Sequence, residues 1–318
     1  EPYRRQRQMC IRDRYEGIYN MDLTSPRTIR NIQEQFGFTF KKGLGQNFLT
    51  ARNILEEIVD AAEIESGVIE VGPGFGVLTS ELAQNSDKVV TIEIDERLID
   101  VLDYTLAEYD NVKIINEDIL KLDLKKVIDD EFNGEKVSIA ANLPYYITTP
   151  IITKLLEEKL PIKNIVVMVQ KEVAERMSAK PSTKDYGAIT VLCQYYTEPS
   201  IVANVPASLF VPPPKVDSAV LKLKVLDKPS VEVKDEGVFF RVVKAAFSQR
   251  RKTLLNCLSA NFPIPKDEIS TLLESIGIAP SRRGETLSLE EFANIADTLL
   301  QKIKSVSYTH LTLPTIRL

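Results

Sequence analysis

The sequence is poor in the side chains that most often carry acid–base and metal chemistry: its 318 residues include one histidine, three cysteines and no tryptophan. The histidine, His310, lies near the C-terminus, so chemistry in the main body must proceed without imidazole. This argues against Ser-His-Asp and Cys-His hydrolases and against enzymes whose metal is held by histidine. Cys10, Cys193 and Cys257 lack metal-ligand or CxxC spacing, so neither a disulfide framework nor a metal site is expected.

Long apolar runs are also missing. No stretch approaches the roughly 18 apolar residues that a membrane span needs, and no short apolar stretch follows a basic start. The 40 Lys and Arg against 45 Asp and Glu give a formal charge of −5, which by itself identifies no partner. With 44% apolar residues the chain can bury a full core. We therefore expect a cytoplasmic protein that has no membrane partner.

The two ends differ in composition from the rest of the chain. Residues 1–14 contain five arginines and show no helical or strand period, and residues 305–318 break a helical pattern that ends near Ile303. Both ends resemble translated sequencing-adapter sequence, so we expect residues 1–20 to be a non-native leader and residues 305–318 a non-native tail. Without residues 1–14 and the tail, the formal charge becomes about −9.

Between the ends, short β-branched runs alternate with helix-length segments. The runs span 68–71, 89–94, 112–115, 137–141 and 165–169, and the helical segments include 53–62, 78–84, 97–106 and 150–156. This alternation predicts an α/β fold with a doubly wound, mostly parallel sheet. Two more strands, one of them the alternating run 218–225, are expected to close the sheet antiparallel, which makes seven strands.

After Lys228 the pattern changes to helices alone. Apolar residues recur at helical spacing within 239–247, 269–276 and 292–300, and Ser288 with Glu291 has the spacing of a capping box. We therefore predict an α/β domain over 21–228 and a smaller all-helical domain over 229–304. Cys193 lies on an apolar helical face before this boundary and is expected in the core.

A glycine-rich turn follows the first predicted strand, in the segment EVGPGFG at 70–76. Glycines here let the backbone pass close to a ligand and place a helix N-terminus against it. The spacing is GxGxG rather than the GxGxxG of dinucleotide binders, and Pro73 removes one amide that a pyrophosphate would use. The turn therefore favours S-adenosylmethionine, although a tight turn that merely needs glycine is the alternative for this motif alone.

Carboxylates follow the next two strands. Glu93 ends the second strand, where it can accept both hydroxyls of a ribose. Asp118 follows the third strand and is placed to accept from an adenine amine, although an aspartate after a strand is also a common turn residue.

The most specific motif is Asn142-Leu143-Pro144-Tyr145, at the end of the fourth predicted strand. The exocyclic amine of adenine is planar and poorly nucleophilic. The Asn142 oxygen and a backbone carbonyl beside Pro144 can accept its two hydrogens, and Tyr145 can stack on the base. This chemistry needs positioning and electrostatics but no imidazole. The alternative is an Asn-Pro turn with a packed tyrosine.

With these motifs, Met21 to Lys304 resembles the ribosomal RNA adenine dimethyltransferase family, and specifically its small-subunit branch, which dimethylates two adjacent adenosines near the 3′ end of that RNA. Besides the motifs above, the resemblance rests on the segments GQNFL at 45–49, PPPKVDS at 212–218 and QRRKTL at 249–254.

The resemblance implies a set of site residues. Cofactor contacts would come from Asn47, Leu49, Gly72, Gly74, Glu93, Asp118, Ile119 and Asn142. Catalysis would rest on Asn142, Leu143, Pro144 and Tyr145 together with Phe210, which would lie across the target base opposite Tyr145. The resemblance further implies a Rossmann-like methyltransferase fold, S-adenosyl-L-methionine as cofactor, no metal, small-subunit rRNA in the immature 30S subunit as partner, and a monomer.

Basic residues gather locally despite the acidic balance. In the helical domain Arg250, Arg251 and Lys252 lie together at a predicted helix start, and Arg282 and Arg283 follow later. An acidic protein with such clusters can bind RNA through one face, so we predict RNA contacts at residues 250–252. The alternative is that these arginines pair with acids to hold the helices together.

Three other functions share parts of this pattern. A large-subunit rRNA methyltransferase of the macrolide-resistance type would have the same catalytic motifs, but the segments at 250–254 and 282–285 favour the small-subunit branch. A non-catalytic ribosome-assembly factor would not need the intact motifs at Glu93, Asp118 and Asn142. A nicotinamide dehydrogenase would need GxGxxG and a proton donor, and the sequence provides neither.

Overall fold

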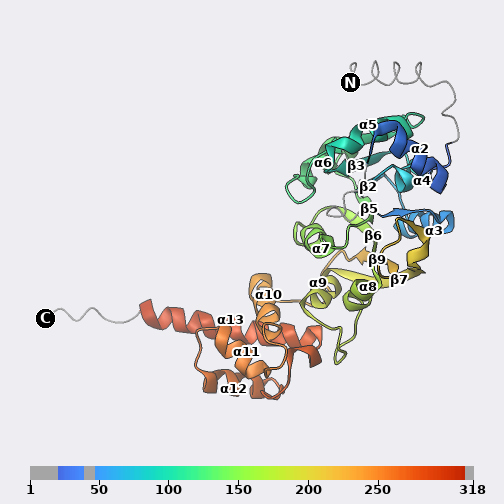
Figure 1. Cartoon of the computed structure of the whole chain (residues 1–318). Helices are drawn as coiled ribbons and strands as arrows, with labels where there is room; N and C mark the ends of the chain where they lie inside the picture. The colour runs from blue at the N-terminus through green and yellow to red at the C-terminus, as the bar shows by residue number, and fades with distance from the viewer. Residues whose placement is uncertain (1–20, 39–46, 312–318) are drawn as a thin grey trace. The chain divides into compact units, whose positions relative to one another are not determined.

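The computed structural model describes residues 21–38 and 47–311, with side chains up to Lys304, and its contacts divide the chain into two units (Figure 1). The first unit contains the described residues up to Ala174 together with Glu198–Val225. The second contains Glu175–Thr197 and the described residues from Leu226 onward. The predicted leader at 1–20 lies outside the described residues, as does the tail from 312.

A seven-stranded sheet forms the centre of the first unit, in the order β4-β3-β2-β5-β6-β9-β7. Its strands are β2 (Val68–Val71), β3 (Val89–Glu93), β4 (Val112–Asn116), β5 (Val137–Asn142), β6 (Ile162–Gln170), β7 (Thr197–Val205) and β9 (Ser218–Val225). Strands β2 to β6 pair in parallel and β9 pairs antiparallel with β6. The predicted mostly parallel seven-stranded sheet is therefore confirmed.

Helices separate the strands along the chain. They are α2 (Pro26–Phe36), α3 (Arg52–Ala62), α4 (Val77–Gln84), η2 (Glu96–Leu98), α5 (Ile99–Thr105), α6 (Leu124–Phe132), α7 (Thr148–Glu157) and α8 (Lys171–Met177). A second, two-stranded sheet pairs β1 (Phe48–Leu49) with β8 (Phe210–Val211), and η3 (Ala207–Leu209) precedes β8. Because β3 and β5 lie on opposite sides of β2, the strand order reverses there, which is where such sheets open a ligand crevice.

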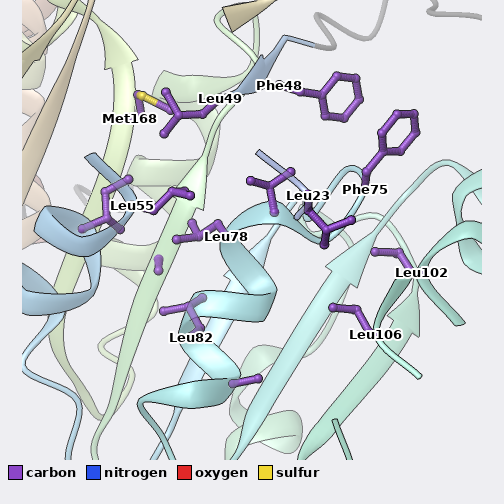
Figure 2. Packing of buried hydrophobic residues seen from close by; sticks show 14 of the residues in the cluster. Leu23, Phe48, Leu49, Leu55, Phe75, Leu78, Leu82, Leu102, Leu106 and Met168 are labelled. Atoms are coloured by element: carbon purple, nitrogen blue, oxygen red, sulfur yellow. The ribbon is translucent and has the colours of Figure 1, made fainter. Parts of the chain in front are cut away.

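The core of this unit reaches from the sheet to the residues before the first long strand. All four residues of β2 are buried, as expected for a strand covered on both faces. Figure 2 shows the rings of Phe48 and Phe75 side by side; they stack with centroids 4.3 Å apart and planes 12° apart. Leu49 and Met168 belong to the same cluster, so the two-residue strand β1 is fixed by packing against the main sheet.

The second unit is helical in its C-terminal part. Its elements are α9 (Ala188–Tyr196), α10 (Glu236–Ala246), α11 (Leu254–Asn261), α12 (Lys266–Ser275), η4 (Gly284–Thr286) and α13 (Leu289–Leu311). The predicted capping box is confirmed: Ser288 N donates to Glu291 Oε2 at 2.9 Å, and Glu291 N donates to Ser288 Oγ at 3.2 Å. The expected end of the last helix near Ile303 is wrong, because no glycine or proline interrupts 304–311 and the helical backbone continues to Leu311.

The division into units differs in one respect from the predicted boundary at residue 228. Glu175–Thr197, which the sequence pattern placed with the sheet, clusters with the helices. The cause is aromatic packing: the Tyr195 ring stacks on Phe239 with centroids 4.8 Å apart and meets Phe240 edge-on. Cys193 is buried, as predicted. Among the described helices none is long and apolar enough to cross a lipid bilayer.

Candidate active site

A crevice lies where β2, β3, β4 and β5 end. It is lined by most of the residues that the sequence assigned to the cofactor and the target amine: Asn47, Leu49, Gly72, Gly74, Glu93, Asp118, Ile119, Asn142 and Pro144. These residues come from five separate segments, and parallel pairing brings the strand ends to one edge of the sheet. The structure thus brings together residues up to 97 positions apart in the chain.

The glycine turn forms one wall of this crevice. Gly72, Gly74 and Gly76 all have positive φ, at 70°, 58° and 85°. A Cβ at Gly72 would meet no atom within 4 Å, so the backbone there faces open space, whereas a Cβ at Gly74 would lie 2.6 Å from Cε1 of Phe48. Gly76 is the N-cap of α4, so unpaired amides at that helix start lie at the turn.

Glu93 is nearly buried, with 6% of its surface exposed. Its Oε1 accepts a hydrogen bond from the backbone N of Asp95 at 2.8 Å, which fixes the carboxyl at the end of β3. Burial raises the pKa of Glu93 to about 7, although hydrogen bonds from the backbone amides of Asp95 and Gly74 oppose the rise. A carboxyl in this position is an acceptor whose charge changes near neutral pH.

Asp118 lies in the turn after β4. Its Oδ1 accepts from the backbone N of Leu120 at 3.0 Å, and Lys121 Nζ lies 3.8 Å from Oδ2. These contacts are those of an Asx-type turn, so the residue serves local structure and lines the crevice at the same time.

A second carboxyl lies beneath the glycine turn. Glu70 is 1% exposed, lines the crevice, and accepts a hydrogen bond from Thr79 Oγ1 at 2.5 Å. Burial raises the pKa of Glu70 to about 8, with Glu93 adding to the rise. No role for Glu70 is predicted from the sequence, where its position just before the glycine turn is the only signal for it.

The Asn142 amide is oriented by a bond across the crevice. Its Nδ2 donates to the backbone O of Asn47 at 3.0 Å, which leaves Oδ1 as the acceptor on the other side of the amide. The carbonyl of Pro144 accepts from Ile147 N at 3.1 Å and from Thr148 Oγ1 at 3.3 Å. Because the Pro144 carbonyl already accepts two hydrogen bonds, the Leu143 carbonyl is the one beside the proline that is considered for the target amine.

Three predicted catalytic residues are placed away from the crevice lining. Leu143 and Phe210 are 2% and 3% exposed, and Phe210 lies opposite Leu49 in the β1–β8 pair. Tyr145 is half-buried, and its hydroxyl is hydrogen-bonded to Ser218 Oγ at 2.7 Å. Burial raises the pKa of that hydroxyl above its usual range. The predicted roles of these three residues stay predictions.

Other residues at the crevice were not found from the sequence. Tyr146 and Ile94 line it with 59% and 56% of their surface exposed, and Phe48 and Met168 contribute apolar wall. Ile94 was predicted as the last residue of the run 89–94, but the strand ends at Glu93 and leaves Ile94 at the crevice. Tyr146 could not be distinguished from Tyr145 by sequence alone.

The predicted RNA-binding residues lie in the second unit and differ in their contacts. Arg250 donates from Nη2 to the backbone O of Lys184, and its Nε lies 3.7 Å from Glu285 Oε2. Arg251 and Lys252 are exposed, and neither side chain has a hydrogen bond or ion pair to any residue that the structure describes.

The neighbouring Arg282 is also engaged, donating to Thr286 O at 2.6 Å and to Glu291 Oε2 at 2.9 Å. Arg250 and Arg282 therefore fit the alternative prediction, in which arginines pair with other groups of the protein to hold its segments together. The described residues contain no group of three or more His, Cys, Asp and Glu side chains able to hold a metal ion.

Comparison with known proteins finds a family and curated relatives that are described as enzymes modifying ribosomal RNA. Residues 37–301 match the family described as ribosomal RNA adenine dimethylase. The chain is 54% identical over 285 residues to the ribosomal RNA small subunit methyltransferase A of Bacillus mycoides, covering 88% of this chain and 98% of that protein, and equally similar to that of Bacillus anthracis.

Among solved structures, a dimethyladenosine transferase from Plasmodium falciparum is 30% identical with a TM-score of 0.67, covering 81% of this chain and 98% of that one. The 23S rRNA methyltransferase ErmE is 27% identical with a TM-score of 0.61, covering 80% and 100%.

Proposed function

Because the chain belongs to the ribosomal RNA adenine dimethylase family, we propose that it transfers methyl groups from S-adenosylmethionine to the N6 amines of two adjacent adenosines near the 3′ end of small-subunit ribosomal RNA. The observation that carries this proposal is the convergence of Gly72, Glu93, Asp118 and Asn142 on one crevice. The small-subunit substrate is supported by the 54% identity to relatives named for that subunit.

The crevice residues fit the methyl donor. Open space beside Gly72 admits a ligand against the backbone, and the Glu93 carboxyl is fixed where a ribose would present two hydroxyl donors. Asp118 and Ile119 would hold the adenine ring by a polar and an apolar contact, and Asn47 and Leu49 would cover the ligand from the β1 segment. When bound, S-adenosylmethionine supplies a methyl group on a positively charged sulfur.

The chain's part in the reaction is to orient a weak nucleophile. Asn142 Oδ1 and the Leu143 carbonyl would accept the two hydrogens of the adenine amine, which turns its lone pair toward the methyl donor. The hydrogen bond from Asn142 Nδ2 to Asn47 fixes which end of the amide faces the acceptor. The one histidine of the chain, His310, lies near the C-terminus, so this arrangement makes no use of an imidazole.

The target base would lie between aromatic side chains. Tyr145 would stack on one face, with its ring anchored through Ser218, and Phe210 would lie across the other. Phe210 is buried in the core, so it can contact the target base only if the β8 segment moves when RNA binds.

The remaining proposals concern partners. We propose that the immature 30S subunit is the substrate, that residues 229–304 with Arg250, Arg251 and Lys252 make its RNA-binding domain, that the protein acts as a monomer, and that it acts in the cytoplasm. The second candidate is methylation of large-subunit RNA, which the similarity to ErmE favours. A non-catalytic assembly role is less consistent with the complete set of crevice residues.

Methyl transfer from labelled S-adenosylmethionine tests the function directly. Immature small subunits, large-subunit RNA and a no-RNA control would be compared, with Asn142→Ala as the inactive reference. We expect label in the small-subunit RNA, two methyl groups on each of two adenosines, and none in large-subunit RNA. Label only in large-subunit RNA would reject the substrate assignment in favour of the second candidate.

A further inference from the structure

Three segments meet beside the crevice, on the side away from Glu93 and Asp118. Strand pairing places Asn142 of β5 opposite Met168 of β6, and Gln170 of β6 opposite Ser218 of β9. The chain leaving β5, the chain leaving β6 and the chain entering β9 therefore lie together. The hydroxyl contact between Tyr145 and Ser218 joins the first to the third.

The backbone joins the other two segments: Lys171 N donates to Asp217 O at 3.0 Å. Tyr146 and Val216 flank these links and are 59% and 45% exposed. Exposed side chains of this size are few in the described chain, and Tyr146 also lines the crevice. An aromatic ring left in water beside a site for a flipped base is a surface on which another base can stack.

Two lysines complete this surface. Lys171 and Lys215 are exposed, and neither has an ion pair or hydrogen bond from its side chain to any described residue. Asp217, the acid nearest to Lys215 in sequence, uses Oδ1 to accept from the backbone N of Ala207 at 2.9 Å. Most other described lysines of this unit pair with carboxylates: Lys88, Lys113, Lys121, Lys125, Lys154, Lys163, Lys222 and Lys224.

We propose that Tyr146, Lys171, Lys215 and Val216, together the Tyr146 surface, bind single-stranded RNA next to the target adenosine. Tyr146 stacks on a neighbouring base, Val216 extends the apolar contact, and the two lysines contact phosphates. The combination of a stacking ring with unpaired cations suits single-stranded RNA, since every base has a face to stack and every linkage a charge. The inference rests on the proposed function for the identity of the RNA, but the surface itself can be tested without methyl transfer.

The first test measures how salt weakens binding of the full chain to a fluorescently labelled single-stranded oligoadenylate. Replacing both lysines, Lys171→Gln with Lys215→Gln, should reduce the slope of log affinity against log salt by about 1.4, at about 0.7 for each phosphate contact on a single strand. The matched control is Lys125→Gln with Lys224→Gln, whose lysines are 70% and 59% exposed but ion-paired. An unchanged slope in the first variant, or an equal change in the control, would overturn the assignment of phosphates to these lysines.

The second test separates stacking from catalysis. With immature small subunits and saturating cofactor, Tyr146→Ala should raise KM for RNA roughly 5- to 150-fold, the range for loss of one stacked base, and this rise should exceed any fall in kcat. Tyr146→Phe keeps the ring and should restore KM. Equal loss in both variants, or an unchanged KM in Tyr146→Ala, would overturn the stacking role. If the parent protein methylates no small subunit, the proposed function fails, while the oligoadenylate measurement still decides the surface.

Discussion

The two units differ in the balance of acidic and basic residues. Residues 21–174 and 198–225 carry 29 Asp and Glu against 19 Lys and Arg, whereas residues 175–197 and 226–304 carry 13 against 15. An acidic unit repels a phosphate backbone at long range, so the unit that holds the proposed chemistry depends on local cations such as Lys171 and Lys215 for its contacts with RNA. The near-neutral helical unit, with exposed cations, is the better source of attraction for RNA.

The units also differ in where their charged groups lie. In the sheet unit two carboxyls, Glu70 and Glu93, are buried at the crevice and have raised pKa values. In the helical unit Arg250 and Arg282 link segments, while Arg251 and Lys252 stay exposed. The difference suggests that variants of the crevice residues in the first unit change chemistry and cofactor binding, and that variants of the exposed cations in the second unit change RNA binding alone.

The largest effect should come from Asn142. Asn142→Ala removes the acceptor proposed to orient the adenine amine, and we expect the single-turnover rate at saturating cofactor and RNA to fall roughly 100- to 1000-fold. The control is Asn111→Ala, since Asn111 Nδ2 also bonds backbone carbonyls, those of Ala83 and Ser86, but lies outside the crevice lining. A near-normal rate for Asn142→Ala would contradict the amine-orienting mechanism.

Glu93 should dominate cofactor affinity and its pH dependence. Glu93→Ala should weaken S-adenosylmethionine binding about 10- to 150-fold, the loss expected for a charge-assisted hydrogen-bond pair. Because the pKa of Glu93 is about 7, its carboxyl is protonated below that pH and accepts hydroxyl donors less well. Affinity in the parent should therefore rise as pH increases through 7.

Calorimetry across pH 6 to 8 checks this dependence, with Glu93→Gln expected to remove most of the rise. A pH profile that is the same in the variant and the parent would assign the titration to another group and weaken the contrast between the units.

The buried Glu70 should make stability pH-dependent. Its pKa is raised from 4.5 in the unfolded chain to about 8, so the proton bound by folded Glu70 stabilises the fold fully below pH 4.5, and this contribution is lost as pH rises through 8. Each pH unit in that window is worth up to ~1.4 kcal/mol. Glu70→Gln should raise the melting temperature more at pH 8 than at pH 5. A constant difference between variant and parent would show that Glu70 does not titrate there.

The smallest effects should come from the helical unit, where the two kinds of basic residue can be separated. Arg251→Gln with Lys252→Gln should flatten the salt dependence of RNA binding by roughly 1.4 to 1.8, leaving the melting temperature and cofactor affinity unchanged. Arg250→Gln should instead lower stability by no more than about 1 kcal/mol, since the Arg250 side chain that pairs with Glu285 is 68% exposed. If Arg250→Gln alone produced the salt effect, the distinction between linking and exposed arginines would fail.

Much of the sheet and its crevice could be predicted because their signals are local. A β-branched run specifies a strand, and a polar residue at or shortly after the end of such a run, as with Glu93, Asp118 and Asn142, must lie at the carboxyl edge. The different exposure of Tyr145 and Tyr146 could not be predicted, because it depends on Ser218, 73 residues away from Tyr145.

The same limit applies to the unit boundary and to the basic cluster. The attachment of α9 to the helical unit depends on Tyr195 meeting Phe239 and Phe240, and the partner of Arg250 is a backbone carbonyl in the loop before α9. Such pairings between distant segments leave no periodicity in either segment.

The hydrogen bond from Asn142 to the carbonyl of Asn47 has a thermodynamic consequence for the order of binding. Asn47 lies beside the methyl donor's proposed position, and Asn142 lies beside the acceptor's, so one bond spans both half-sites. A donor that immobilises the Asn47 segment also holds the Asn142 amide in the orientation that the acceptor needs. Because linkage is reciprocal, RNA bound at Asn142 tightens the hold on the donor by the same factor. The two substrates should therefore bind with positive cooperativity.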